Sequence, residues 1–451
     1  MTNSQETPIA SPATGLSHAY RALRHRNFRL FFAGQSISLI GTWMTRVATA
    51  WLVYRLTKSA VLLGTVSFAG QIPTFLLAPL AGVLVDRWNR QTVLVWTQAL
   101  AMIQSLALAA LTLTHRITIA EVLALSAFQG VINAFDMPGR QSFLMEMVRE
   151  DGKTDRNDLS NAIAINSSMV NLARLVGPSL AGMLIAITSE GWCFLVDGIS
   201  YIAVIASLLL MRLARSEVRA TAAREHSTLF IQLKEGWDYV RSFAPIRTIL
   251  LLFALVSLMG MPFTVLMPIF AGQVLHGGPH TLGFLMGALG VGALASALSL
   301  VLRKSVRGLL KMIPFAAASF GVGLIGFGLS HFVWLSMILL LLTGFGMMQG
   351  LTASNTIIQT IVPEEMRGRV MSYYTVAFVG MAPFGSLLAG GLANVIGAPW
   401  TVVISGASCI LGAAWFFTRM KTVRKAMRPI YEQLGIIPTA HLPEVQEAAA
   451  N

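Results

Sequence analysis

Long apolar runs separated by short polar segments dominate the chain. A helix that spans the hydrocarbon core of a bilayer needs about 20 mostly apolar residues, and the sequence offers twelve such runs. Glycine and proline within the runs are compatible with helices, because neighbouring helices can satisfy the backbone groups they leave free. The expected helices cover residues 28–55, 61–85, 92–113, 119–143, 160–187, 192–212, 248–272, 281–302, 310–330, 332–360, 371–396 and 399–419. The pattern therefore predicts an all-α membrane protein with twelve transmembrane helices.

Composition supports this placement. Hydrophobic residues make up 55% of the 451 positions and charged residues only 12%, which is more apolar surface than one water-soluble core could bury. The first 27 residues are polar and basic, and the apolar run that follows is too long for the central region of a signal peptide. We therefore expect the amino end to stay uncleaved.

The net charge of +13 could suggest a nucleic-acid partner, but its distribution argues against one. When the amino end is placed in the cytoplasm, most of the 33 Lys and Arg residues fall in segments on that side. Basic loops are retained in the cytoplasm, so this bias predicts that both termini are cytoplasmic. The lipid bilayer is thus the expected large-scale partner, and no nucleic acid is expected.

The chain divides into two similar halves. Gln129-Gly130 followed by Asn133 is echoed by Gln349-Gly350 followed by Asn355. Such repeats are typical of transporters whose substrate site lies between the halves. The expected units are a cytoplasmic segment at 1–27, a six-helix bundle at 28–212, a cytoplasmic linker at 213–247, a second six-helix bundle at 248–420 and a cytoplasmic tail at 421–451. Together they predict two pseudo-symmetric six-helix bundles.

The linker and the tail carry weaker signals. Apolar residues recur at helical spacing over residues 229–240, which indicates an amphipathic helix at the cytoplasmic membrane surface. A solvated linker helix without membrane contact fits the same pattern. The tail begins basic and ends polar, so we expect it to be partly disordered.

Polar residues form stripes on four of the expected helices. Such residues are costly in a bilayer unless they face protein or water, and their helical spacing places each set on one face. The stripes therefore predict a polar substrate cavity between helices, with hydrogen bonding between helices as the alternative. The candidate substrate-binding residues are Thr42 and Arg46 in 28–55, Gln129 and Asn133 in 119–143, Asn171 and Arg174 in 160–187, and Thr352, Asn355 and Gln359 in 332–360.

Arg46 and Arg174 are the two arginines that lie well inside the apolar runs, away from their ends. A guanidinium keeps its charge and must find a carboxylate, carbonyl groups or water. These arginines suit an anionic or strongly hydrogen-bonding substrate. The structural alternative is an ion pair, for which Asp197 is the expected partner of Arg46.

Three acids are candidates for proton coupling, because a proton-driven carrier needs a group that binds and releases a proton during its cycle. Glu121 and Asp197 lie near the outer ends of their helices, and Asp136 is expected to pair with Arg140 four residues further on. No isolated acid stands at mid-membrane.

A charged turn over residues 82–90 separates the second and third helices. Asp86 could accept hydrogen bonds from the start of a helix in the other half, where the helix dipole is positive, and so hold the cytoplasmic side shut. Arg87 and Arg90 could pair with acids or lipid phosphates, or act as positive-inside anchors. The helix that Asp86 could cap begins near Arg367 and Arg369.

The sequence contains no signature of an enzyme or of an ATP-driven pump. It has no Gly-rich phosphate loop, no metal-spaced histidine cluster and no Ser-His-acid set on one side of the membrane. Cys193 and Cys409 are the only cysteines, too few for a thiolate metal site. We expect no cofactor and no metal.

Several segments carry a resemblance to a known family. Gly82-x-x-x-Asp86-Arg87-x-x-Arg90 resembles the loop 2–3 signature of the major facilitator superfamily, with Asn89 where many members have glycine. The stretch around Gly177-Pro178 resembles the helix 5 antiporter motif of that superfamily, with alanines at two usual glycines. Residues 133–141 and 363–372 are similar to the bacterial enterobactin-exporter branch, also called transmembrane secretion effectors. The similarity spans about residues 20–420.

The resemblance implies a fold in which helices 1, 4, 7 and 10 line a central cavity, and a branch that exports siderophores and drugs. We therefore expect a monomeric, proton-coupled exporter of a small or medium organic molecule in the bacterial cytoplasmic membrane, working by alternating access. Its gating residues would be Gly82, Asp86, Arg87, Arg90, Asp136, Arg140, Gly177, Pro178, Arg367 and Arg369. An importer of the same fold and a sensor or scaffold that has lost transport are the alternatives.

Overall fold

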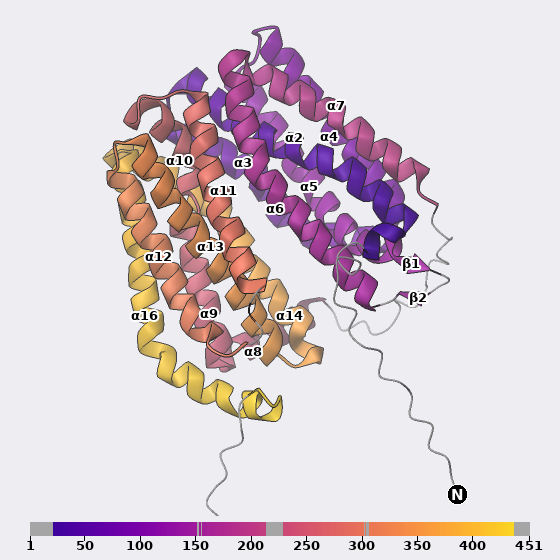
Figure 1. Ribbon diagram of the computed structural model, residues 1–451, viewed down its shortest axis with the longest axis vertical. Helices are drawn as coiled ribbons and strands as arrows, with labels where there is room; N and C mark the ends of the chain where they lie inside the picture. Colours follow the sequence, from indigo (N-terminus) through magenta and orange to yellow (C-terminus); the bar gives the residue numbers. More distant parts are fainter. Residues whose placement is uncertain are drawn as a thin grey trace, which may run out of the picture.

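The structure is a computed structural model that describes residues 21–150, 153–154, 156–212, 229–301, 303 and 306–436. Long helices form two groups that are consecutive in sequence (Figure 1). The first group comprises η1 (Arg21–Arg24), α2 (Arg26–Thr57), α3 (Ala60–Arg87), α4 (Arg90–Leu113), α5 (Ile119–Met147), α6 (Arg156–Ile187) and α7 (Glu190–Leu210). A small antiparallel hairpin, β1 (Arg149–Glu150) and β2 (Lys153–Thr154), precedes α6.

The second group follows α8 (Leu229–Ser242). Its helices are α9 (Ala244–Leu255), α10 (Phe263–Ile269), α11 (Pro279–Val301), α12 (Leu309–Leu329), α13 (Val333–Ile361), α14 (Glu364–Thr375), α15 (Ala382–Ile396) and α16 (Ala398–Gln433). Three π-helical turns interrupt them, at η3 (Val256–Gly260), η4 (Phe270–Val274) and η5 (Val376–Gly380). The expectation of a helical, multi-pass membrane protein is confirmed.

Eleven helical segments of the described chain are long and apolar enough to cross a membrane. α2 falls outside this set although it has 32 residues, because Gln35, Thr42 and Arg46 make it more polar. It nevertheless packs along α7 and α6. A twelfth crossing by α2 remains a prediction.

Two expected helices are broken near prolines. The run expected at 248–272 is divided by η3, which ends just before Pro262, and η5 ends close to Pro383. Proline has no backbone N–H, and its ring clashes with the carbonyl four residues earlier. A π turn shifts the hydrogen bonding by one residue, as in the 3.0 Å bond from Met261 N to Val256 O.

The last helix is longer than expected. α16 continues to Gln433, past the predicted end at 419. Val423 and Met427 are buried against the second group, so the segment after 421 forms an amphipathic helix. Residues 437–451, the rest of the expected tail, lie outside the described residues.

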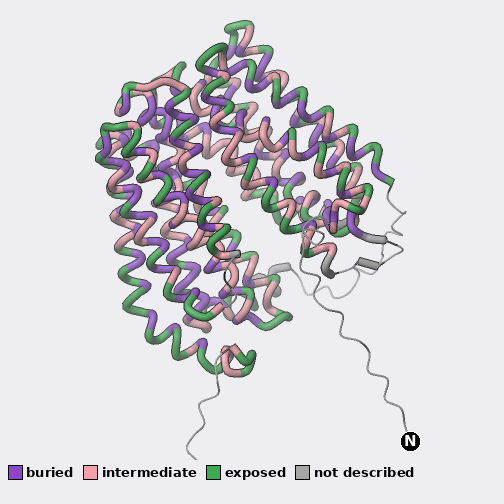
Figure 2. Tube along the Cα trace, viewed as in Figure 1, coloured by how far each residue is buried: buried purple, intermediate pink, exposed green. Residues whose placement is uncertain are grey.

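The two groups meet at one end and diverge at the other. At the end opposite to α8, here called the far end, a single buried cluster combines Leu52 and Ala181 of the first group with Phe270 and Leu282 of the second. Toward the α8 end, each group has a buried cluster of its own. Figure 1 shows the separation, and Figure 2 shows buried residues inside each group.

Small residues allow the close approach at the far end. A Cβ added at Gly182 of α6 would lie 2.8 Å from the Cα of Gly283 of α11, so the two backbones touch. On the other side, Ser67 of α3 donates a hydrogen bond of 3.1 Å to Ser386 of α15. The ring of Phe384 packs edge-on against the ring of Phe68 at 6.1 Å.

Candidate functional site

Arg46 of α2 and Arg174 of α6 both contact the ring of one tryptophan, Trp43. The guanidinium carbon of Arg46 is 4.6 Å from the ring centroid of Trp43, and that of Arg174 is 5.2 Å from it. Both distances are within the range of cation–π contacts. The sequence analysis missed Trp43, although its position three residues before Arg46 places both on one helix face.

Gly177 explains how α6 comes close enough for this contact. A Cβ at Gly177 would lie 2.5 Å from the Cβ of Trp43 and 3.0 Å from the carbonyl oxygen of Ile40. Glycine is therefore required where α6 crosses α2, one turn after Arg174. The Gly177-Pro178 element thus sets the distance between the two arginines.

Neither arginine has an ion-pair partner among the described residues. The Arg46 side chain is exposed, and a charge within a membrane helix that stays exposed must face water rather than lipid. The Nε atom of Arg174 is buried and has no hydrogen-bond acceptor. We therefore expect the Arg46 charge to face water, with the half-buried Arg174 bringing a second positive charge to the same tryptophan.

The alternative role of Arg46, an ion pair with Asp197, is absent from the described contacts. Asp197 is only 2% exposed, and its Oδ2 atom accepts hydrogen bonds from Thr45 at 2.9 Å and from Ser105 at 3.1 Å. Its Oδ1 atom has no partner. Thr45 rather than Arg46 faces α7, because adjacent positions on a helix point about 100° apart.

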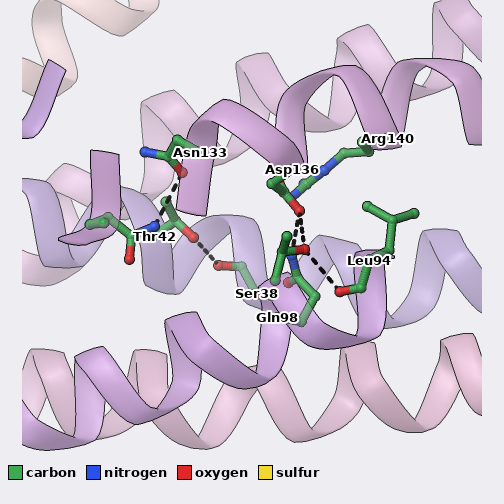
Figure 3. A network of polar contacts seen from close by, with 9 residues as sticks. Ser38, Thr42, Leu94, Gln98, Asn133, Asp136 and Arg140 are labelled. Atoms are coloured by element: carbon green, nitrogen blue, oxygen red, sulfur yellow. Dashed lines mark hydrogen bonds and ion pairs between the residues drawn. The ribbon is translucent and has the colours of Figure 1, made fainter. Parts of the chain in front are cut away.

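Asp136 and Arg140 form the predicted ion pair along α5. Asp136 also accepts a hydrogen bond of 2.7 Å from Gln98 and one of 3.2 Å from Thr97, both on α4. Figure 3 shows Asp136 between Arg140 and Gln98. This carboxylate is fully engaged within the first group.

Each group contains a hydrogen-bonded pair of amide side chains on one helix. Gln129 donates to Asn133 at 3.1 Å on α5, and Gln359 donates to Asn355 on α13. The Oε1 atom of Gln129 is buried without a partner, whereas Gln359 is exposed and Thr352 half-buried. Each group therefore has one Gln–Asn pair, although the sequence repeat had aligned Gln349 rather than Gln359 with Gln129.

The other two predicted binding residues bond to their own helices. Thr42 donates to the carbonyl of Ser38 at 3.0 Å, and Asn171 donates to the carbonyl of Ser167 at 3.0 Å. Thr42 lies about one turn before Arg46, and Asn171 lies about one turn before Arg174. Both therefore adjoin the arginines along their helices.

Glu121 has a local structural role. It is the third residue of α5, and its carboxylate accepts hydrogen bonds from the backbone and hydroxyl of Thr118 in a capping box. Its position at the helix start gives it no contact with the arginine pair.

The charged turn after α3 is described in part. Arg90 pairs with Glu146 of α5 at 2.5 Å, and Arg87 is exposed. No Cβ at Gly82 would meet an atom within 4 Å. The side chain of Asp86 lies outside the described residues, so its expected contact with the other half stays a prediction.

α8 is docked on the second group, an arrangement that neither sequence-based alternative specified. Arg369 of α14 pairs with Glu235 of α8, and the rings of Trp237 and Tyr373 are 5.9 Å apart. Arg367 lies 3.8 Å from Glu364, and its Nε atom is buried without a partner.

A small apolar cavity of about 30 Å³ lies inside the second group. Phe253 of α9, Met261 just after η3, Phe320 of α12 and Met347 of α13 are among the residues that line it. Methionine side chains are flexible and adapt to irregular ligands. The described residues contain no group of three or more His, Cys, Asp or Glu that could hold a metal ion.

Comparison with known proteins agrees with this architecture. The sequence model of the transmembrane secretion effectors matches residues 17–447. The Staphyloferrin A transporter of Staphylococcus aureus is 27% identical over 87% of this chain and 96% of its own length. The multidrug efflux pump Tap of Mycolicibacterium fortuitum is 25% identical over 86% of this chain and 95% of its own.

Solved structures show the same fold. A crystal structure of the nucleoside transporter NupG matches with a TM-score of 0.66 at 11% identity, covering 88% of this chain and 99% of that one. A bacterial homologue of the human lysosomal transporter Spinster, in an inward-facing and occupied conformation, matches with a TM-score of 0.65 at 13% identity, covering 90% and 98%. The chain therefore belongs to the transmembrane secretion effector family of the major facilitator superfamily and is a membrane transporter.

Proposed function

We propose that this transporter exports a small or medium organic molecule from the bacterial cytoplasm by alternating access, in exchange for protons. The observation that carries the proposal is the combination of a far end sealed by one shared core with an α8 end at which the two groups diverge. With the α8 end in the cytoplasm, as the distribution of basic residues indicates, the arginine pair is reached from inside the cell.

The cargo is proposed to be siderophore-like or drug-like. This follows from two relatives, one named as a transporter of staphyloferrin A and one as a multidrug efflux pump. Thr42, Gln129, Asn133, Asn171, Thr352, Asn355 and Gln359 are proposed to contact the cargo together with the arginines.

The turn after α3 is proposed to close the cytoplasmic side. Asp86 would cap the start of α14 in the opposite group when the groups close, beside Arg367 and Arg369 of that helix. Arg90, Asp136 and Arg140 would keep α4 and α5 moving as one body, because Arg90 pairs with Glu146 of α5 and Asp136 accepts hydrogen bonds from Thr97 and Gln98 of α4.

Asp197 is the proposed proton carrier among the three candidate acids. Asp136 is paired with Arg140, and Glu121 caps α5. Asp197 is buried, receives only hydroxyl donors among the described residues, and keeps one oxygen free. The described residues give Asp197 no counter-charge, whereas Asp136 has one in Arg140. Its hydrogen bond from Thr45 places it one residue from Arg46.

Transport in inverted membrane vesicles tests the proposal. With an acidified lumen, which corresponds to the outer side, cargo should enter the lumen while protons leave it, and a pH-sensitive dye should report a cargo-dependent rise in luminal pH. Proton flow in the same direction but with cargo leaving the lumen would show an importer. If the protein is correctly inserted but the luminal pH does not change when cargo is added, the result would support a sensor or scaffold.

The coupling residue is tested in the same vesicles. Asp197→Asn should abolish gradient-driven accumulation but retain exchange of cargo for cargo, because the amide cannot carry a proton. Glu121→Gln, at a carboxylate that caps α5, is the matched control and should remain coupled. Accumulation at the wild-type level in Asp197→Asn would contradict the assignment.

A further inference from the structure

We propose that Arg46 and Arg174 form one anion-binding site across Trp43, and that the cargo is an organic anion bearing at least two acidic groups, such as a polycarboxylate. This inference rests on the proposed function, because it names the cargo class of the same site. It goes further in requiring negative charge on the cargo.

The first argument is the unbalanced charge of the pair. Arginine remains protonated at all physiological pH values, so α2 and α6 bring two like charges to one indole ring. Like charges repel more strongly inside a protein than in water. The described residues supply neither arginine with a carboxylate, so an anion from outside the chain is the natural counter-charge.

The second argument is the free donors. Each guanidinium carries five N–H groups in a planar fork that matches a carboxylate in two parallel hydrogen bonds. Arg46 is exposed, and the buried Nε of Arg174 lacks an acceptor. A buried donor without an acceptor is unfavourable, and a bound carboxylate would satisfy it. The ring of Trp43 orients both guanidinium groups before the anion binds.

The third argument is the placement of the nearby acids. Asp136 is committed to Arg140 and Gln98, and Asp197 to Thr45 and Ser105. Neither carboxylate is directed at the arginine pair. A cationic cargo would therefore meet two positive charges with no compensating acid, which selects against it.

Binding to the purified full-length protein in lipid nanodiscs tests the charge requirement. The probes are citrate, 1,2,3-propanetricarboxylate, the uncharged trimethyl citrate and the cation tetraphenylphosphonium, all at one ionic strength. The two tricarboxylates should bind saturably and the trimethyl ester should not. No saturable binding by either tricarboxylate, or tighter binding of the cation at this site, would overturn the proposal.

Substitutions test whether the tricarboxylates bind at Arg46 and Arg174. Arg46→Ala and Arg174→Ala should each weaken tricarboxylate binding at least about tenfold, because each removes charge-assisted hydrogen bonds. Arg46→Lys should give an intermediate loss, since lysine keeps the charge but lacks the fork. Arg116→Ala removes an exposed arginine from the loop before α5 and should leave binding unchanged. Equal losses in all four variants would contradict the site.

Folding and transport are measured separately from tricarboxylate binding. Each variant is compared with the wild type by thermal unfolding in the same nanodiscs, and the lysine variant keeps the test valid if an alanine variant fails to fold. Cargo-driven proton flux without tricarboxylate binding would overturn only the anion assignment. Tricarboxylate binding without any flux would overturn the proposed function and leave the anion site standing.

Discussion

Asp136 shows how a charge is held inside the first group. The spacing of four residues was enough to predict its pair with Arg140, because side chains at i and i+4 meet on one helix face. The hydrogen bonds from Thr97 and Gln98 of α4 were not predictable, since they depend on how α4 and α5 pack. The same dependence explains why Asp197, the possible partner of Arg46 in the structural alternative, accepts a hydrogen bond from Thr45 instead, since the rotation of α2 against α7 decides which residue faces the acid.

Removal of this buried carboxylate should be strongly destabilising. Asp136→Ala leaves Arg140 without its partner in a site where Asp136 is 7% exposed, and breaking such a pair costs about 3 kcal/mol. Glu432→Ala, which breaks the more exposed pair with Arg428 on the last turns of α16, should cost at most about 1 kcal/mol. Unfolding titrations of both variants in the same detergent measure the difference, and equal losses would show that the Asp136 network does not stabilise the fold.

At the scale of helices, the apolar runs predicted where the helices lie, but not where their regular hydrogen bonding is interrupted. The expected run at 119–143 corresponds to α5 and the run at 310–330 to α12, because length and hydrophobicity suffice to define a membrane helix. The π turns beside Pro262 and Pro383 were not predicted, since proline is tolerated within membrane helices. The continuation of α16 beyond residue 419 was not predicted, because its basic residues are also typical of a polar tail.

The glycine contact between α6 and α11 should control the seal at the far end. In Gly283→Leu, the Cβ alone would lie 2.9 Å from the carbonyl oxygen of Pro178 and 3.0 Å from the Cα of Gly182, so the helices must separate to admit the rest of the side chain. A cysteine introduced by Ser179→Cys should then react several-fold faster with a membrane-impermeant maleimide added outside the cells.

Gly391→Leu is the matched control, because no atom lies within 4 Å of a Cβ at that position of α15. The native thiols of Cys193 and Cys409 are buried and should contribute little background. Equal labelling of Ser179→Cys in both leucine variants would show that this contact does not form the seal.

For the whole molecule, the internal echo between the halves predicted two similar units with polar faces toward each other. The structure has one Gln–Asn pair in each half, Gln129 with Asn133 on α5 and Gln359 with Asn355 on α13, but the repeat had named Gln349 as the glutamine of the second half. The sequence does not encode which end is open in a given state, because both states use the same residues. That property follows from the shared core at the far end and the separate cores near α8.

Electron–electron distance measurements between spin labels test alternating access most directly. One pair of labels, at Trp88→Cys and Glu364→Cys, measures the distance between the two groups at the α8 end. A second pair, at Thr114→Cys and Phe332→Cys, measures it at the far end. All four positions are exposed. As conditions shift the population toward the outward-open state, the first distance should shorten while the second lengthens. Asp86→Asn should hold the first distance long. Distances that stay fixed at both ends throughout transport would contradict the account.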